Sequence, residues 1–290
     1  MSPGREPGPP VGRPKGEHDV RGLAFRRAET DEEIESGPVA PTKPPSRLTL
    51  PKLLTIPSLL AVVLIITFLW ISNVKLDSIA KNTLKGDAVV NALWEHVELT
   101  VISTFFVLII AIPLGIALTR KSLRRASPVV MALANIGQAT PAIGLLALLV
   151  IWLGIGQSTA LIGIIIYAVL PVLSNTIAGL RAIDPTLVDA ARGIGMSSLG
   201  VLARVELPLA VPLILAGVRT ALVLNVGTAT LATFGGGGGL GDLINSGITN
   251  QRMPVLVLGS VLTVALALLV DWLASLAEVL LRPRGLEVGG

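Results

Sequence analysis

Long stretches without a charged residue most strongly limit how this chain can fold. Residues 53–71 carry no charge, and no charged residue occurs between Arg125 and Arg181. A bilayer core takes roughly 20 apolar helical residues to cross, and helices satisfy their own backbone hydrogen bonds there. Only 14% of all residues are charged, which is well below the share in soluble domains. The sequence therefore predicts an all-α integral membrane protein.

The apolar runs predict about six transmembrane helices. The uncharged stretch after Arg125 is too long for one span and divides at Gly154-Ile155-Gly156-Gln157. The last two runs contain the charged residues Arg219 and Asp271, respectively. The predicted spans are residues 53–71, 97–119, two spans within 126–180, 207–234 and 253–281.

Residues 1–50 differ in composition from the rest of the chain, being rich in Pro, Gly, Arg and Glu without an apolar period. Such a segment cannot bury enough apolar surface to offset the entropy lost on ordering. We therefore expect a disordered cytoplasmic tail, followed by an additional N-terminal transmembrane helix at 51–72.

Basic residues gather in the loops on one side of the six predicted spans. The positive-inside rule places those loops and both termini in the cytoplasm of a multi-pass protein of the plasma (inner) membrane. The basic residues on this side are Lys43, Arg47, Lys52, Arg120, Lys121, Arg124, Arg125, Arg181, Arg192, Arg204, Arg282 and Arg284.

Composition argues against several kinds of site. Cysteine is absent, and the only histidines are His18 and His96, so no metal site is expected. The run Gly235–Gly239 is not followed by the Lys-Ser/Thr of a phosphate-binding loop, and we interpret it as a flexible external turn. The formal net charge of +4 is placed around the membrane spans, so no nucleic-acid partner is expected.

The loop at residues 181–208 is the most informative segment. Asp184-Pro185 is typical of a helix start, since the carboxylate caps free amides and proline is already set for the first turn. Two glycines can end that helix. A second short helix over 199–206, capped by Ser197 or Ser198, is expected before Pro208 starts the next span.

One long signature runs through this loop: an acidic residue, Ala-Ala, a glycine, and an aliphatic-x-Leu-Pro. It consists of Asp189, Ala190, Ala191, Gly195, Val205, Leu207 and Pro208. The signature resembles the EAA loop of ABC importer permeases, although that family usually has Glu at position 189 and Ile at position 205. The resemblance implies a type I ABC importer permease-like fold, in which this loop is the coupling helix that docks on the ATPase subunit. Small alanine side chains let a helix sit deep in a groove.

Three further stretches resemble the permeases for glycine betaine, choline, carnitine and related osmoprotectants. They are IGQATPAIGLLALL from Ile136, YAVLPVLSNTIAGLRAIDP from Tyr167, and GVRTALVLNVGTATLATFGGGGGLG from Gly217. The resemblance predicts a permease domain at 96–282 that translocates an osmoprotectant, with proline betaine in the same class, by alternating access.

The same resemblance implies the partners. A dimer of ABC ATPase subunits is expected to bind ATP and Mg, so this chain is expected to hold no cofactor and not to be an enzyme. An extracytoplasmic substrate-binding protein is expected to deliver the solute. A second permease copy, identical or a paralogue, is expected to complete the pathway within the lipid bilayer.

Two alternatives remain open from the sequence. The chain could be an ABC importer permease for another amino acid-like solute. It could also be an ion-coupled secondary transporter, in which Arg219 and Asp271 would be the candidate ion site. That second alternative leaves the signature in loop 181–208 without a role.

Polar residues inside the apolar runs are the remaining candidates for function. Arg219 and Asp271 lie at matching depths, and a charge inside a membrane is costly unless paired. We predict that they form an ion pair, as a structural clip rather than a substrate or proton site. Other polar residues and one proline are candidates for the translocation pathway, with interhelical hydrogen bonding as the alternative. They are Gln138, Thr140, Pro141, Asn175, Thr176, Thr228 and Thr230.

Overall fold

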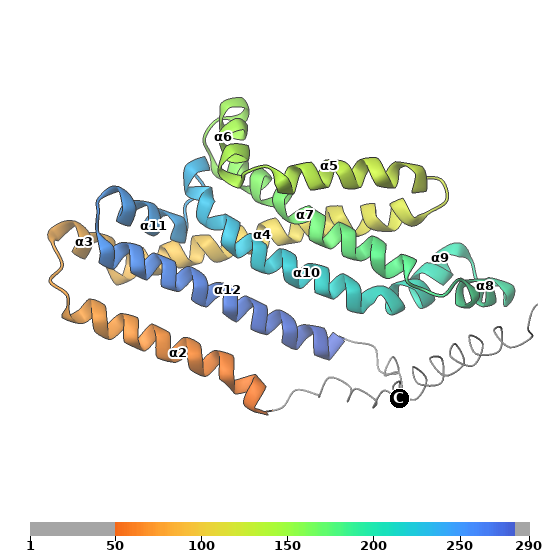
Figure 1. Cartoon of the computed structure of the whole chain (residues 1–290), viewed down its shortest axis with the longest axis horizontal. Helices are drawn as coiled ribbons and strands as arrows, with labels where there is room; N and C mark the ends of the chain where they lie inside the picture. The colour runs from red at the N-terminus through yellow and green to blue at the C-terminus, as the bar shows by residue number, and fades with distance from the viewer. Residues whose placement is uncertain (1–49, 282–290) are drawn as a thin grey trace, which may run out of the picture. The chain divides into compact units, whose positions relative to one another are not determined.

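The computed structural model describes residues 50–281, and the regular structure in this range is helical throughout (Figure 1). The predicted tail apart from Leu50, together with Arg282 and Arg284, lies outside the described residues. The elements are α2 (Leu50–Asn73), α3 (Ser78–Thr83), α4 (Gly86–Thr119), η1 (Arg124–Ala126), α5 (Ser127–Ala139), α6 (Ala142–Leu153), α7 (Gln157–Arg181), α8 (Pro185–Gly193), α9 (Ser198–Val201), η2 (Leu202–Glu206), α10 (Leu207–Ala229), η3 (Thr230–Gly235), α11 (Leu240–Thr249) and α12 (Met253–Leu281).

The prediction of about six spans is confirmed for the part of the chain that the structure describes. Five helical segments are long and apolar enough to cross a membrane: α2, α4, α7, the run Ser198–Gly235, and α12. Helices α5 and α6 pass the same test only as a pair bent by 99°, and they make a sixth span if the pair is counted as one broken span rather than a re-entrant loop. The gap between α6 and α7 falls at the predicted Gly154–Gln157 break.

Helices α4, α7 and α10 pack against one another and form the centre of the bundle (Figure 1). Their buried apolar side chains, including Val107, Leu173 and Ala221, make one cluster. Nearby, the Asn225 amide of α10 donates to the Thr104 hydroxyl of α4 at 2.8 Å, and both side chains are buried. Interhelical hydrogen bonds and close packing hold helices together where lipid provides no hydrophobic drive.

The chain bends sharply between α5 and α6 because of a proline. Thr140 is extended, with φ −66° and ψ 133°, as expected for a residue whose backbone is restricted by a following proline. Pro141 has no amide hydrogen for the helical ladder. Two helices therefore meet at this point instead of one.

Two predicted boundaries are wrong. Helix α4 begins at Gly86 rather than near 97, because Ala92 in its polar first part is buried against Leu240 and Val255. The second predicted short helix does not stop before Pro208, because α9, η2 and α10 form one continuous run. Segment η2 is a π-helix, and its wider turn accommodates a proline ring that would clash in an α-helical turn.

Helices α3 and α11 lie at the same end of the bundle (Figure 1) and were not predicted from the sequence. Asp77 starts α3 by accepting a hydrogen bond from the Ala80 amide at 2.9 Å. The other Asp77 oxygen is 2.6 Å from Nη2 of Arg252, just before α12. Asp77 therefore anchors α3 to the start of the last helix.

The glycine run after η3 is packed against α4, whereas the sequence analysis predicted a flexible turn. The Gly239 amide donates to Glu95 Oε2 at 3.0 Å. A Cβ atom added to Gly241 would lie 2.0 Å from the carbonyl oxygen of Thr230. The glycines therefore allow a close backbone approach at this end of the bundle.

We expect the contacts of Asp77 with the Ala80 amide and with Arg252 to weaken at low pH. The Ala80 amide, together with the Arg252 guanidinium, lowers the pKa of Asp77 below its ordinary value of 3.8. A pKa that is depressed in the folded chain gives stability that is present above the ordinary value and is lost as pH falls through the folded pKa. Hydrogen exchange at residues 78–83, corrected for intrinsic rates, should be slow at neutral pH and faster in acid.

The variant Asp77→Asn should show fast exchange at residues 78–83 already at neutral pH. Asp87→Asn is the matched control, because Asp87 is an exposed acid in the first turn of α4. Equal protection of α3 in Asp77→Asn and the unchanged chain would contradict the anchoring role.

Candidate functional site

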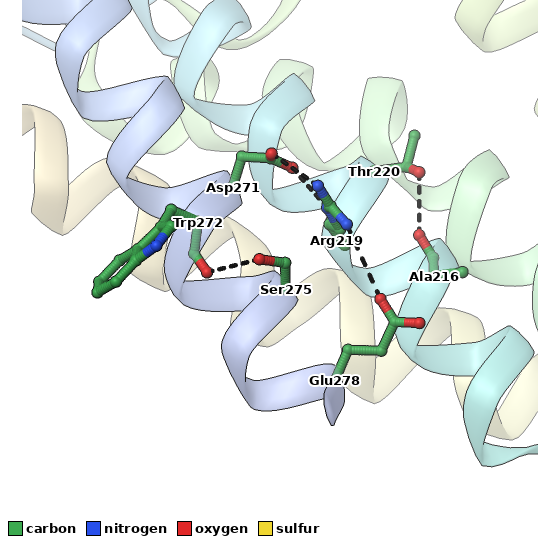
Figure 2. Close-up of polar contacts among 7 residues, drawn as sticks. All are labelled: Ala216, Arg219, Thr220, Asp271, Trp272, Ser275 and Glu278. Carbon is green, nitrogen blue, oxygen red and sulfur yellow. Dashed lines mark hydrogen bonds and ion pairs between the residues drawn. The ribbon is translucent and has the colours of Figure 1, made fainter. Parts of the chain in front are cut away.

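Arg219 of α10 and Asp271 of α12 are in direct contact within the membrane-spanning helices (Figure 2). Nε of Arg219 donates to Oδ1 of Asp271 at 2.5 Å, and Nη2 donates to Oδ2 at 2.7 Å. Two parallel charge-assisted hydrogen bonds fix the geometry of the pair as well as its energy. The structure therefore brings together the two intramembrane charges identified in the sequence.

Glu278 is a third member of this charged cluster that the sequence analysis missed. Its Oε2 lies 3.9 Å from Nη1 of Arg219, and Figure 2 shows the guanidinium between the two carboxylates of α12. Glu278 follows Asp271 by seven residues, which places both on one face of a helix. The seven-residue spacing could therefore have identified Glu278 from the sequence. The cluster has one positive and two negative side chains.

An open groove of about 490 Å³ lies along α10 beside the ion pair. The hydroxyls of Thr220 and Thr228 donate to carbonyls within their own helix, so their oxygens can still accept. Arg219 comes twelve residues after the start of α10, about 18 Å along the helix axis. This depth is near the middle of a membrane core about 30 Å thick. The groove is lined by Arg219, Thr220, Val223, Leu224, Gly227, Thr228 and Asp271.

Of the predicted pathway residues, all within the described range, Thr228 is the one that lines this groove. Thr176 is buried at the contact of α7 with α4, where a Cβ atom on Gly115 would meet its methyl group at 2.7 Å. Asn175 packs in the same way against Gly217 of α10. These two side chains lie at helix contacts.

The other predicted pathway residues do not line the groove. Gln138, Thr140 and Pro141 are at the bend between α5 and α6, and the Thr230 hydroxyl donates to the Gly227 carbonyl at 2.7 Å. A second, very small pocket shares Thr228 with the groove. It is lined by Ala142, Leu146, Gly163, Ile164, Tyr167 and Thr228.

Loop 181–208 lies at the end of the bundle opposite α3 and α11 (Figure 1). Asp184 starts α8 by accepting from the Thr186 amide at 2.8 Å. Gly195 ends this turn with φ +90°, a backbone conformation that favours glycine. Ser197 starts α9 by accepting from the Gly200 amide at 3.2 Å. The loop is therefore a helix–turn–helix with a polar cap at each start.

The signature residues of α8 face two directions. Ala190 is exposed, whereas Ala191 is buried. The Asp189 side chain is 76% exposed and lies 3.8 Å from Arg192. Large apolar side chains are also exposed around the signature, and the sequence analysis missed them. They are Leu187, Ile194 and Leu199.

The later signature residues join the loop to the bundle. Leu207 packs against a buried cluster that contains Leu180, Ala210 and Ile214. Val205 and Pro208 are half-buried on either side of it. The end of the loop is therefore fixed to the membrane helices, while α8 is presented outward.

An ion pair between Arg120 and Glu206 connects this loop to the end of α4. Both Nη atoms of Arg120 donate to the two carboxylate oxygens of Glu206. The Glu206 side chain is 10% exposed and that of Arg120 is 34% exposed. The residues are 86 positions apart, so no local spacing in the sequence indicates the contact.

We expect Arg120→Ala to destabilise the chain more than Glu206→Gln. Removing Arg120 leaves a nearly buried carboxylate unpaired, whereas Arg120 left alone can reach water. Breaking a fully buried pair costs about 3–5 kcal/mol, and partial exposure lowers the expected cost here to about 1–3 kcal/mol. The thermal unfolding midpoint of the purified chain in detergent measures this difference.

Lys121→Ala is the control, because Lys121 is a neighbouring exposed cation. Exchanging the two charges, Arg120→Glu with Glu206→Arg, should recover part of the lost stability. Equal effects of the two single variants, with no recovery on exchange, would show that the contact is unimportant.

The chain is similar in sequence to a family of transport proteins. Residues 111–282 match the model of a family described as "Binding-protein-dependent transport system inner membrane component". The chain is 36% identical over 202 residues to the choline transport system permease protein OpuBB of Bacillus subtilis (strain 168), covering 70% of this chain and 92% of that protein. It is 37% identical over 193 residues to the glycine betaine/carnitine/choline transport system permease protein OpuCB of the same organism, covering 67% and 88%.

The helix arrangement is also similar to a solved structure. An inward-facing form of the MetNI methionine ABC transporter matches with a TM-score of 0.61 and 24% identity, over 67% of this chain and 96% of that one. This similarity concerns the fold alone. The family match spans more than half of the chain and includes the groove, the pairs Arg219–Asp271 and Arg120–Glu206, and loop 181–208. The chain therefore belongs to the family of binding-protein-dependent transport system inner membrane components.

Proposed function

We propose that this chain is the permease subunit of an ATP-binding-cassette importer for an osmoprotectant of the glycine betaine, choline, carnitine or proline betaine class. The observation that carries the proposal is loop 181–208, which presents Asp189 and Ala190 outward at one end of a membrane-spanning bundle. The choice of solute is supported by the names of the choline and glycine betaine/carnitine/choline permeases to which the chain is similar.

In this proposal a dimer of partner ATPases binds ATP and Mg, while this chain binds neither. Helix α8 docks on the ATPase, and two connections carry its motion into the bundle. The Arg120–Glu206 pair leads to α4, and the continuous run Ser198–Gly235 leads to α10. Because α10 lines the groove, movement of the loop changes access to the pathway.

The proposed orientation in the membrane and the proposed domain bounds follow from the same features. The basic residues around loop 181–208 support an orientation in which that end, and both termini, face the cytoplasm at the plasma (inner) membrane. The opposite end, with α3 and α11, faces an extracytoplasmic substrate-binding protein. The permease domain covers 96–282, an additional membrane helix at 51–72 precedes it, and a second permease copy completes the pathway.

The test is uptake of labelled glycine betaine, choline and carnitine into vesicles that contain this chain with its ATPase and binding protein. ATP-dependent uptake of any of them supports the proposal. Uptake that continues without the ATPase would instead indicate an ion-coupled transporter. A complex that docks and hydrolyses ATP but takes up none of the three solutes would keep the importer and reject the solute class.

A further inference from the structure

The groove along α10 exposes both members of an ion pair to one space. Arg219 and Asp271 each line it, whereas the rest of the lining is apolar or small apart from two threonines. The two side chains remain 38% and 27% exposed although they contact each other. A pair that served only as a structural clip would not need both charges to face an open groove.

We propose that this groove is a transient binding site for a zwitterionic solute, whose carboxylate binds Arg219 and whose quaternary ammonium lies beside Asp271. This inference rests on the proposed function and narrows its solute class. Glycine betaine and carnitine carry both charges, whereas choline carries only the positive one.

An exchange of partners explains why the solute needs both charges. In the empty groove Arg219 and Asp271 neutralise each other. A zwitterion replaces Asp271 on Arg219 and at the same time supplies a cation to Asp271, so no charge is left unpaired inside the membrane. A lone cation would take Asp271 away from Arg219 without offering that guanidinium a carboxylate.

Glu278 makes the exchange possible without isolating the arginine. It lies 3.9 Å from Nη1 of Arg219 and is not part of the groove lining. The guanidinium has five N–H donors, and Asp271 occupies only Nε and Nη2. Arg219 can therefore keep Glu278 as a carboxylate neighbour (Figure 2), while its groove side contacts the solute.

The remaining walls also suit such a solute. Val223, Leu224 and Gly227 offer an apolar surface to the methyl groups of a quaternary ammonium. The volume of about 490 Å³ lies within the roughly 300–1,000 Å³ of small-molecule sites. The groove is open, which suits weak binding during passage, and it lies near the depth at which transporters bind their solutes.

The absence of native cysteine allows a direct test with a single introduced thiol. Thr220 is exposed and lines the groove, so Thr220→Cys places a thiol of similar size there. The permease–ATPase complex in detergent is labelled with a water-soluble thiol reagent, with or without glycine betaine or choline. Thr249→Cys is the matched control, because Thr249 is exposed on α11 at a distance in the fold.

Glycine betaine at twice its Kd should slow labelling of the groove thiol about threefold, since the free fraction is 1/(1 + [L]/Kd). Choline at the same concentration should slow it much less, and the control thiol should not respond to either solute. A groove thiol that does not react with the reagent would overturn the proposal. Equal protection by both solutes would overturn it as well.

A second variant separates solute binding from structural support. Arg219→Gln with Asp271→Asn and Glu278→Gln, in the Thr220→Cys background, removes all three charges of the cluster and leaves none of them without its partner. This variant should still dock the ATPase but lose protection by glycine betaine. Retained protection would contradict the proposal. Uptake by the unchanged complex tests the proposed function separately, because labelling does not depend on transport.

Discussion

Ala190→Trp is expected to abolish ATP-driven uptake while leaving the chain folded. Ala190 is exposed on α8, so a large ring at this position meets little within the chain. It would instead fill the space between α8 and a docked ATPase. Overpacking a fitted contact costs about 1–3 kcal/mol, which weakens the docking Kd roughly 5–150-fold. Co-purification with the ATPase and uptake into vesicles measure the two consequences.

Neighbouring residues sharpen this experiment. Ala191 is buried, so Ala191→Trp should lower the thermal unfolding midpoint of the chain itself. Asp189→Lys reverses an exposed charge and should weaken docking without unfolding. Thr249→Trp is the control, because Thr249 is exposed at the other end of the bundle. Normal docking of Ala190→Trp would show that α8 is not the ATPase contact.

Arg219→Leu is expected to cause the largest loss of stability among changes to the charged cluster. It leaves the carboxylates of Asp271 and Glu278 in a membrane-spanning helix without their cation. One unpaired charge near a helix centre costs about 2.5–3.5 kcal/mol, and their partial exposure lowers the expected total to about 2–3 kcal/mol. The yield of folded protein in detergent and its thermal unfolding midpoint should both fall.

The other two members of the cluster should matter less, in a definite order. Asp271→Asn leaves Arg219 close to Glu278, which can take over as its partner. Glu278→Gln leaves the two short hydrogen bonds to Asp271 intact and should have the smallest effect. Arg219→Leu combined with Asp271→Leu is the control that removes the closest unpaired charge, and it should recover stability. A loss from Glu278→Gln equal to that from Arg219→Leu would contradict the arrangement.

Features set by neighbouring residues or by the bilayer could be predicted from the sequence. Uncharged length located the spans, because the membrane imposes one dimension on every helix. Asp184 and Ser197 start helices by capping amides two or three residues away. The contact of Arg219 with Asp271 followed from their equal depth and from the cost of leaving either alone.

Features set by tertiary packing could not be predicted in this way. The Arg120–Glu206 pair joins residues 86 positions apart. Nothing in the repeated Ala-Ala indicates that Ala191 is buried while Ala190 is exposed. Pro208 was expected to begin a new helix because proline usually does, and the preceding π-helix overrides that tendency. Glu278, by contrast, could have been predicted, because its spacing from Asp271 places both residues on one helix face.

The π-helix η2 also sets the angular phase between α9 and α10. Its hydrogen bonds reach one residue further than those of an α-helix, so the segment Leu202–Glu206 holds an additional residue. One residue corresponds to about 100° around a helix axis. Losing or gaining a single residue there would rotate α8 and α9 about the helix axis relative to α10. No residue of the signature would change. A change in length at this segment alone would therefore alter which face of the loop is presented outward.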